Sequence, residues 1–255
     1  MESVIINSVD RALDILDYLC KYEKEVSITQ ISQDLGVYKS TVYRTLVTLE
    51  NKNYVTKNPE TEKYSLSMKL FIMGNSVGKK VGLQKIVAPY AKELYDEFHE
   101  SVNVSILEHN KNEPYYSVMV YTEENKQILS FNTSLASRNE CYCASVGKCL
   151  LAFQPDLDLS IYEKYPMTQY TQKTITTIME LEKELEKVKK QGFAVDDEER
   201  ELGLTCIGAP ILDSHGIAIA AISLSGPTSR MKDSTYEEKI QRIKEIGEKI
   251  SLKMQ

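Results

Sequence analysis

Residues 39–44 place side chains that can bind a nucleic acid on one side of a short segment. Val42, Leu46 and Leu49 recur at helical spacing and point to one side. The other side gathers polar groups, which are Lys39, Ser40, Thr41, Tyr43 and Arg44. Hydroxyl and ammonium groups hold phosphates, and an arginine can donate two hydrogen bonds to the edge of a guanine. This surface therefore has the chemistry that the major groove of DNA requires.

Three expected helices bring this surface into position. Residues 9–20 repeat apolar side chains on one helix face, with Ser8 as the expected N-cap. Residues 27–30 have the S-x-x-Q pattern of a capping box and open a short second helix. Gly36 supplies the left-handed residue that ends this helix. The third helix, expected at about 38–51, carries the polar surface.

A predicted β-hairpin follows the third helix. Residues 54–56 and 63–66 have strand-like side chains, and 58–62 has the composition of a turn. Lys57 and Lys63 flank the tip, where a wing would meet the DNA backbone. Helix, helix, turn, helix and hairpin is the order of a winged helix-turn-helix.

The rest of the chain mixes strands with helices, and this mixture predicts a second domain of the α+β class. The strand-like segments are 102–108, 115–121, 127–131, 205–212 and 217–224. A capping box at 177–180 opens one helix, and an amphipathic helix closes the chain through Ile240, Ile243, Ile246 and Ile250. We therefore expect three parts, namely a winged helix-turn-helix at 1–66, a linker helix at 67–82 and an α+β domain at 83–255.

Composition fits a two-domain protein of the reducing cytoplasm. The chain has 255 residues, more than the roughly 100–150 of a common domain. Its longest apolar run, 217–222, is far below the about 20 residues of a membrane span. Residues 1–10 lack the basic and apolar regions of a secretory signal. Five cysteines are an odd and dilute set that argues against a disulfide scaffold. We expect a cytoplasmic protein without a membrane helix.

Positive charge is concentrated in one part of the chain. The net charge is −6, which does not by itself indicate nucleic-acid binding. Residues 1–35 carry three basic and seven acidic side chains, whereas 36–64 carry five basic and three acidic ones. The excess of positive charge therefore coincides with the predicted third helix and hairpin. A solvated charged face on a small helical domain remains the alternative explanation.

Four segments resemble the IclR family of transcriptional regulators. They are SVDRALDIL at 8–16, GVYKSTVYRTL at 36–46, GFAVDDEERELGLTCIGAPI at 192–211 and ISLSGP at 222–227. The likeness runs in order over nearly the whole chain. It implies a winged helix-turn-helix joined to a GAF-like effector-binding domain, in a dimer or dimer of dimers that binds a palindromic operator. The two half-sites of such an operator match the two-fold symmetry of a dimer.

The resemblance also implies the residues of two sites. The DNA contacts would be the polar residues of the third helix together with Lys57 and Lys63. The effector contacts of the family fall here on Ser145, Val146, Asp196, Leu204, Cys206, Ser223 and Ser225. A small organic or sugar acid is the implied effector, and a repressor is more common in the family than an activator. No catalytic residue, cofactor or metal is implied by these positions.

The expected effector site is chemically consistent. Ser223 and Ser225 are two apart on a strand, so both side chains face the same side. Two hydroxyls, together with backbone amides at a helix start near Ser145, suit a small carboxylate. Asp196 could accept a hydrogen bond from a ligand hydroxyl, or stay protonated if buried. The alternative is that both serines lie on a solvent-facing surface and that Cys206 is an ordinary core residue.

Four positions depart from the family pattern. Asn53 stands where glycine usually precedes the wing, and asparagine tolerates the left-handed conformation. Near the effector site, Ala136 replaces a glycine, Glu140 a proline and Tyr142 a histidine. These changes leave the identity of the effector open.

Other functions have weaker support in the sequence. Gly147-Lys148 lacks the remaining residues of a P-loop, and no recognised motif supports a cysteine nucleophile paired with a histidine. Cys141 and Cys143 with the distant Cys206 could hold zinc, although the usual C-x-x-C spacing is absent. A small-molecule sensor that acts through protein partners, without DNA, is the main alternative to a transcriptional regulator.

Overall fold

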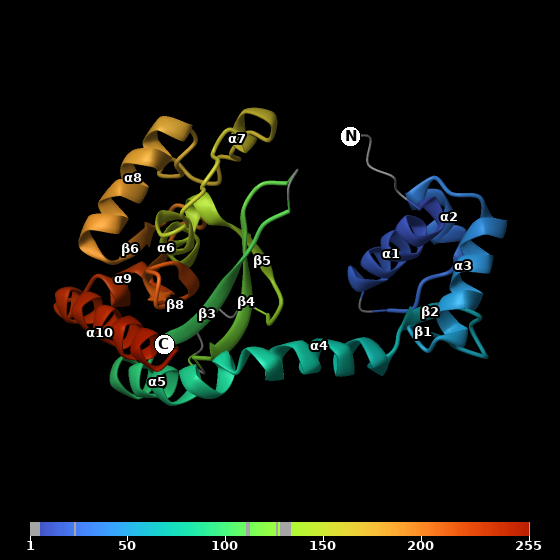
Figure 1. The fold of residues 1–255 in the computed structure, drawn as a ribbon, viewed down its shortest axis with the longest axis horizontal. Coiled ribbons are helices and arrows are strands. Elements are labelled where there is room, and N and C mark those ends of the chain that lie inside the picture. Colours follow the sequence, from blue (N-terminus) through green and yellow to red (C-terminus); the bar gives the residue numbers. More distant parts are fainter. Residues whose placement is uncertain (1–5, 23, 111–112, 126, 128–133, 255) are drawn as a thin grey trace. The chain divides into compact units, whose positions relative to one another are not determined.

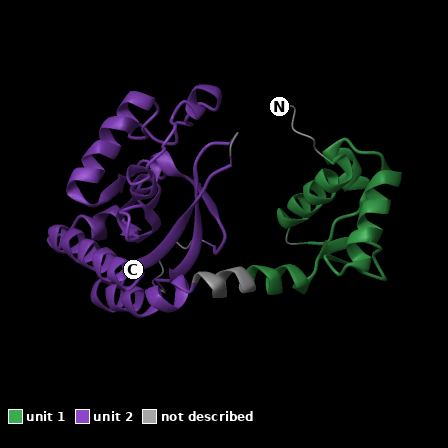
Figure 2. Cartoon of the chain, in the orientation of Figure 1, with its two compact units in different colours: residues 1–81 green, residues 82–255 purple. Residues whose placement is uncertain are grey.

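The chain divides into two units, residues 1–81 and 82–255 (Figure 2). The computed structural model describes residues 6–22, 24–110, 113–125, 127 and 134–254, and for 75–81 the backbone alone. Within these described residues, no helix is long and apolar enough to cross a bilayer.

Unit 1 is a winged helix-turn-helix followed by a long helix (Figure 1). Its elements are α1 (Asn7–Cys20), α2 (Ile28–Leu35), α3 (Lys39–Asn51), β1 (Val55–Lys57), β2 (Tyr64–Leu66) and α4 (Met68–Val81). Strands β1 and β2 pair antiparallel as the wing. One apolar core joins α1, α2, α3 and the wing, with Ile15, Ile31, Val42, Leu46 and Tyr64 at most 1% exposed.

Local signals set most helix ends in unit 1. The Ser27 Oγ accepts from the Gln30 N–H at 3.3 Å, and Gly36 ends α2 with φ +64°. Asn53 adopts φ +59°, so asparagine does serve in the left-handed residue before the wing. The prediction of Ser8 as the N-cap of α1 is wrong. The helix begins at Asn7, because the Ile6 carbonyl already accepts from the N–H groups of residues 9 and 10.

Unit 2 is an antiparallel six-stranded sheet with helices on both faces. The strand order is β5-β4-β3-β8-β7-β6. The strands are β3 (Ser101–Glu108), β4 (Tyr116–Glu123), β5 (Arg138–Glu140), β6 (Ala194–Asp197), β7 (Leu204–Leu212) and β8 (Ala218–Pro227). The helices are α5 (Leu83–Phe98), η1 (Cys141–Cys143), α6 (Ser145–Ala152), α7 (Ile161–Lys164), α8 (Ile178–Gln191), α9 (Thr228–Met231) and α10 (Tyr236–Met254).

Strict alternation along the central strands separates two faces of this sheet. Ile207, Ala209, Ile222 and Leu224 join α5 and α10 in one apolar core. The intervening residues of β7 and β8 face α6, which packs across β7, β8 and β3 (Figure 1). The predicted strand at 127–131 lies, apart from Gln127, outside the described residues. The short edge strands β5 and β6 and the helix α5 were not predicted from the sequence.

Capping and close packing fix the helices on the α6 side. Thr177 accepts from the Glu180 N–H at 3.3 Å, so the predicted capping box does open α8. Gly147 of α6 lies against the backbone of η1, and a Cβ on it would collide with the Cα of Cys141. Helix α6 therefore sits at a distance from η1 that only glycine permits.

The first prediction concerns this contact. Gly147→Ala should destabilise unit 2 by at least about 1–3 kcal/mol, because backbone atoms rather than a movable side chain meet the new methyl group. Gly74→Ala is the matched control, since a Cβ at this position in α4 meets nothing within 4 Å and alanine favours the helix. Urea unfolding followed by circular dichroism measures both. Equal effects of the two variants would contradict the packing argument.

Candidate DNA interface and effector site

The polar side of α3 lies at the surface of unit 1. Lys39, Ser40, Tyr43 and Arg44 are exposed and Thr41 is half-buried, while Val42, Leu46 and Leu49 of the same helix are buried in the core. The structure therefore brings all five predicted contacts to the solvent side of one helix. A helix that presents hydroxyl, ammonium and guanidinium groups in this way can enter a major groove.

Neighbouring groups extend this surface beyond the predicted residues. A surface cleft of about 700 Å³ runs between α1 and α3, and Ser8, Arg11, Arg44 and Thr48 are among its lining residues. Tyr38, directly before α3, is 85% exposed. Sequence reasoning missed Arg11 and Tyr38, because an isolated arginine on α1 and an aromatic residue in a turn carry no signal of their own.

The wing is less positive than its two lysines suggest. Lys63 is exposed, but the Lys57 Nζ lies 2.8 Å from the Glu62 Oε1. This hydrogen bond raises the pKa of Lys57. The turn itself is held by Glu25, whose carboxylate accepts from the Asn58 Nδ2 at 2.6 Å and from the Thr61 Oγ1 at 2.7 Å. The ammonium group of Lys57 is thus engaged by a carboxylate of the same hairpin.

The predicted effector residues of unit 2 come together on the sheet face beneath α6. Asp196 on β6 pairs with Cys206 on β7, which pairs with Ser225 on β8. Directly paired residues of antiparallel strands point to the same face, and Ser223 and Leu204 share it by their even spacing. The alternative of a solvent-facing surface is wrong, because Asp196, Ser223 and Ser225 are only 2%, 3% and 6% exposed.

The start of α6 meets this polar row. Ser145 lies against Gly208, where an added Cβ would stand 3.0–3.2 Å from Ser145 atoms, and Gly208 is the partner of Ser223 in the ladder. The N-cap residue Ala144 contributes no side-chain cap to α6. The first backbone N–H groups of a helix have no intrahelical partner, so those of Ser145 and Val146 are suited to an anion.

Two further polar side chains continue the row and were missed by sequence reasoning. Asn103 on β3 pairs with Ser223 and Thr122 on β4 pairs with Asn103. The Asn103 Nδ2 donates to the Ser225 Oγ at 3.3 Å, and its Oδ1 accepts from the Thr122 Oγ1 at 2.9 Å. Asn103 is 6% exposed. We call the residues Asp196, Cys206, Ser225, Ser223, Asn103 and Thr122 the polar strip.

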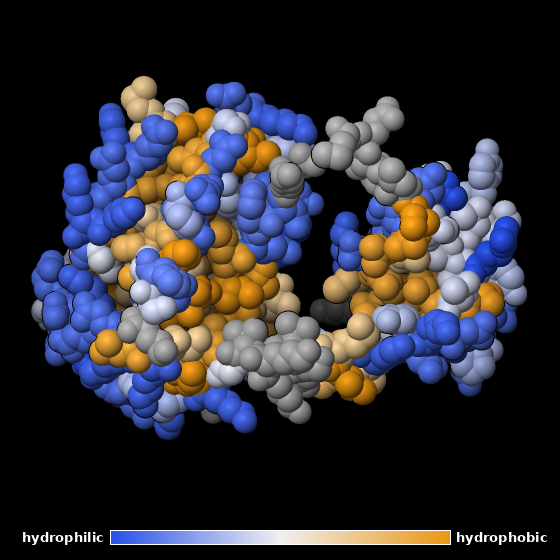
Figure 3. Space-filling view, in the orientation of Figure 1, coloured by the Kyte–Doolittle hydropathy of each residue, from blue (hydrophilic) through white to orange (hydrophobic). Residues whose placement is uncertain are grey.

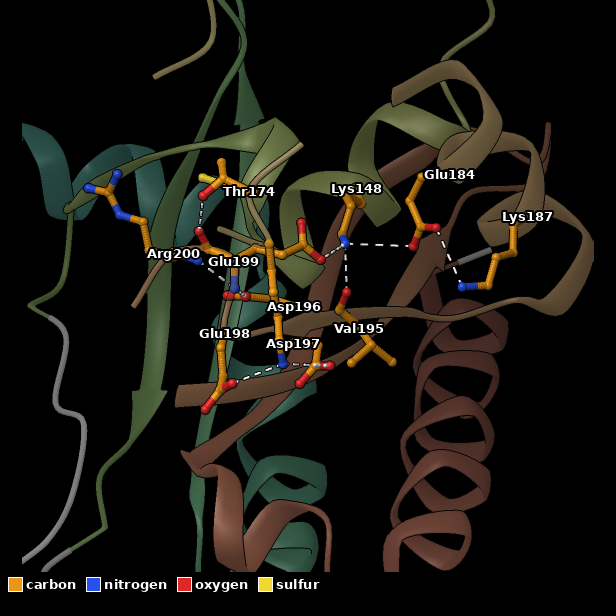
Figure 4. A network of polar contacts seen from close by, with 12 residues as sticks. Lys148, Thr174, Glu184, Lys187, Val195, Asp196, Asp197, Glu198, Glu199 and Arg200 are labelled. Atoms are coloured by element: carbon orange, nitrogen blue, oxygen red, sulfur yellow. Dashed lines mark hydrogen bonds and ion pairs between the residues drawn. The ribbon is translucent and has the colours of Figure 1, made fainter. Parts of the chain in front are cut away.

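A buried lysine fixes the segment that carries Asp196 (Figure 4). The Lys148 Nζ lies 2.6 Å from the Val195 carbonyl oxygen, 2.6 Å from the Glu199 Oε1 and 3.6 Å from the Glu184 Oε1. The Lys148 side chain is 1% exposed. One ammonium group thereby ties α6, α8 and the segment after β6 together. A buried charge is tolerated only when it is paired and hydrogen-bonded in this way.

Burial changes the acidity of the Asp196 carboxyl group. Desolvation, followed by repulsion from Glu199, raises the pKa of Asp196 to about 7. Hydrogen bonds from the backbone N–H groups of Glu199 at 2.8 Å and Arg200 at 3.4 Å act in the opposite direction. Burial also raises the pKa of Glu199. The strip thus contains a carboxyl group that changes its charge near neutral pH.

Two of the positions that depart from the family pattern, Glu140 and Tyr142, contact the same neighbouring segment. The Glu140 Oε2 lies 3.1 Å from the Arg200 Nη1, and the Glu140 Oε1 accepts from the Tyr170 hydroxyl at 2.6 Å. The Arg200 guanidinium stacks 3.7 Å from the Tyr170 ring centroid. The Tyr142 hydroxyl donates to the Thr168 carbonyl oxygen at 3.0 Å. Glu140 and Tyr142 thus each bond to the segment that leads into α8.

The cysteines do not assemble a metal site among the described residues. No group of three or more His, Cys, Asp or Glu side chains there could hold a metal ion. Burial raises the pKa of Cys143 to about 12 and raises those of Cys141 and Cys206 as well.

Comparisons with known proteins decide what these two units are. Residues 8–59 match the IclR helix-turn-helix domain. Residues 76–252 match the family described as bacterial transcriptional regulator IclR, C-terminal. The chain belongs to the IclR family of transcriptional regulators. The predicted winged helix-turn-helix joined to an α+β domain is confirmed, and the chain is a regulator rather than an enzyme.

Individual IclR relatives match along nearly the whole chain. The chain is 33% identical over 250 residues to the HTH-type transcriptional regulator KdgR of Escherichia coli (strain K12), covering 98% of this chain and 93% of that one. It is 27% identical over 234 residues to the transcriptional repressor IclR of the same organism, covering 91% and 84%. The solved structure of the Thermotoga maritima IclR has a TM-score of 0.73 at 28% identity, covering 98% and 99%.

The second prediction concerns pH. The folded-state pKa of Asp196 is raised from 3.8 to about 7, so the folded state binds the proton more tightly than the unfolded state. Its contribution to stability is therefore fully present below about pH 4 and is lost as the pH rises to about 7. Asp196→Asn keeps the acceptor oxygen without the charge, and above pH 7 it should be more stable than the original by up to about 4 kcal/mol.

Urea unfolding of both proteins at pH 5, 6 and 7.5 measures this difference. The advantage of Asp196→Asn should grow with pH, and Asp213→Asn should show no such growth, because hydrogen bonds from the turn lower the pKa of Asp213. An advantage that is constant over this range would mean that Asp196 is ionised throughout.

Proposed function

We propose that the chain is an effector-responsive transcriptional repressor that reads a palindromic operator. Its DNA contacts would be Lys39, Ser40, Thr41, Tyr43 and Arg44 on α3, with Lys57 and Lys63 on the wing. The observation that carries this proposal is the exposed polar side of α3, set on a helix whose other side is fully buried. A reader of chromosomal DNA acts in the cytoplasm, where its operator is.

A homodimer, or a dimer of dimers, would present two such helices to the two half-sites. Unit 1 exposes several large apolar side chains to solvent (Figure 3). They are Ile6, Val9 and Leu13 around α1 and Met68, Phe71 and Ile72 on α4, each more than half exposed. Exposed apolar groups in this number favour association, and two-fold symmetry suits a palindrome.

The effector would bind between the start of α6 and the polar strip of unit 2. Backbone N–H groups of Ser145 and Val146, with the hydroxyls of Ser223 and Ser225, are donors for a carboxylate. Asp196 accepts when ionised and donates when protonated, Cys206 adds a thiol, and Leu204 supplies apolar contact. This donor set supports a small organic acid or sugar acid as the effector.

Coupling between the sites requires that the effector bind two arrangements of the protein with different affinity. In a repressor of this design the effector favours the arrangement that fits the operator less well. Helix α4, which connects the two units, is the element through which this difference would pass.

The third prediction tests the DNA reader. Lys39→Ala/Arg44→Ala should weaken operator binding by more than tenfold, because it removes a phosphate contact and a base contact. It should also reduce, by about 1 to 2, the steepness with which the logarithm of the association constant falls with the logarithm of the salt concentration. Fluorescence anisotropy of a labelled operator fragment, selected beforehand from genomic DNA, measures both quantities.

Lys21→Ala/Lys24→Ala is the matched control, since it removes the same charge at exposed positions between α1 and α2. Equal losses for both double variants would indicate general charge attraction only. Unchanged binding in Lys39→Ala/Arg44→Ala would overturn the DNA-reading role of α3 and favour a sensor that acts through protein partners.

The fourth prediction concerns the wing. Glu62→Gln frees the Lys57 ammonium from its carboxylate partner, so operator affinity should rise a few-fold and the salt slope should steepen by about one counterion. Glu60→Gln changes the net charge equally, and no ion pair of Glu60 is found among the described residues. The same anisotropy assay compares the two variants. A gain no larger than that of Glu60→Gln would show that Lys57 does not reach the DNA.

A further inference from the structure

The turn of the wing is braced from inside and from outside the hairpin. Within the turn, the Asn58 Oδ1 accepts from the backbone N–H groups of Glu60 at 2.9 Å and Thr61 at 3.2 Å. From outside, the Glu25 carboxylate accepts from the Asn58 Nδ2 through one oxygen and from the Thr61 Oγ1 through the other. Both oxygens of this carboxylate therefore bind the turn.

Glu25 itself stands on a fixed support. The next residue, Val26, exchanges two backbone hydrogen bonds with Tyr64 of β2, at 2.8 and 2.9 Å. Val26 and Tyr64 are 2% and 1% exposed and belong to the core that α1, α2 and α3 share. The Glu25 side chain therefore links the tip of the wing to the same core that sets the direction of α3.

Apolar packing does not reach the tip of the wing. Residues 59–63 are exposed, and a surface cleft of about 420 Å³ is lined by Glu25 together with residues of the wing. Strands β1 and β2 pair over only three residues each, and an isolated two-stranded hairpin is at best marginally stable in water. Polar contacts therefore set the direction of the tip.

Charge alone argues against a carboxylate at this place. Hydrogen bonds from Asn58 and Thr61 lower the pKa of Glu25, so this side chain is ionised at neutral pH. Lys57 and Lys63 are the proposed backbone contacts of the wing, and an anion beside them repels phosphates. A carboxylate that only carried charge would weaken DNA binding, whereas one that orients the turn strengthens it.

We infer that Glu25 is a positioning residue that holds the wing so that Lys57 and Lys63 meet the sugar-phosphate backbone beside the half-site read by α3. Glu25 acts through the turn rather than through contact with the DNA. This inference rests on the proposed function, because it concerns the same DNA complex. It adds to that complex a residue of the connection between α1 and α2.

Glu25→Gln tests the inference, because the amide keeps the shape of the side chain but cannot accept through both ends. It should weaken operator binding about three- to tenfold. It should also reduce, by about 1 to 2, the steepness with which the logarithm of the association constant falls with the logarithm of the salt concentration. Fluorescence anisotropy of the labelled operator measures both quantities.

Hydroxyl-radical footprinting at saturating protein shows which DNA contacts are lost. Glu25→Gln should lose protection of the sugar-phosphate backbone beside each half-site and keep the protection within it, under α3. Thr61→Val removes one of the two bonds to the carboxylate without changing the net charge. It should therefore change binding and footprint in the same direction, by a smaller amount.

Glu60→Gln is the matched control, since it removes one negative charge from the same turn. It should leave operator binding unchanged or slightly tighter. The double variant Glu25→Gln/Asn58→Asp reverses donor and acceptor, because the new amide can donate to the new carboxylate, and it keeps the net charge of the original chain. It should restore binding to within about twofold of the original. Circular dichroism during urea unfolding checks that every variant is folded.

Three results would overturn the inference. They are binding by Glu25→Gln as tight as that by Glu60→Gln, an equal loss of protection under α3 and beside it, which a merely structural role would give, and no restoration by the folded double variant. If the original chain protects the half-sites but not the backbone beside them, only this inference fails. If the original chain selects no operator, the proposed function fails and this inference fails with it.

Discussion

One buried ammonium group ties together the elements on the α6 side of the sheet in unit 2. Lys148 extends from α6 and ends on the carbonyl of Val195 and the carboxylate of Glu199, with Glu184 of α8 nearby. Removing one partner of such a buried group leaves an uncompensated charge, which is strongly destabilising. This side chain, the apolar residues of α6 in the core and the tight glycine contact at η1 together hold α6 over the sheet, and hence the start of α6 beside the polar strip.

Burial sets the charge of the same region. Lys148 pairs with Glu199, whereas desolvation, followed by repulsion from Glu199, raises the pKa of Asp196 to about 7. A neutral Asp196 can donate to a ligand, whereas an ionised one repels an acid. The proposed effector site therefore combines a helix start whose N–H groups suit an anion with an acidic group whose charge is suppressed by burial, and both conditions would favour binding of a carboxylate.

Sequence reasoning was most successful where a short stretch determines its own structure. The capping boxes at Ser27 and Thr177, the left-handed stop at Gly36 and the alternation along β7 and β8 are all local and are all present. The four-residue strand β6 and the three-residue strand β5 are too short to produce a pattern, and only their neighbours define them. Ser8 failed as a cap because the carbonyl of an apolar residue, Ile6, starts the helix instead.

The buried polar groups that were missed depend on contacts between distant parts of the chain. Asn103 bonds to Ser225, 122 residues away, and a lone asparagine in a strand has no local mark of a binding role. A lysine side chain is almost always at the protein surface, so burial of Lys148 was not expected. Its three partners lie 36 to 51 residues further along the chain. Family resemblance supplied Asp196, Ser223 and Ser225, whereas the sheet register brings Asn103 and Thr122 into line with them.

The central claim is that α3 reads an operator and that an acid on the polar strip controls this reading. Selection of genomic DNA fragments by the purified chain at near-physiological salt, with and without a panel of small organic and sugar acids, tests both parts together. We predict recovery of a palindromic motif whose retention changes markedly when at least one of these acids is present. Recovery of no motif under any condition, or of a motif whose retention none of the acids changes, would contradict the claim.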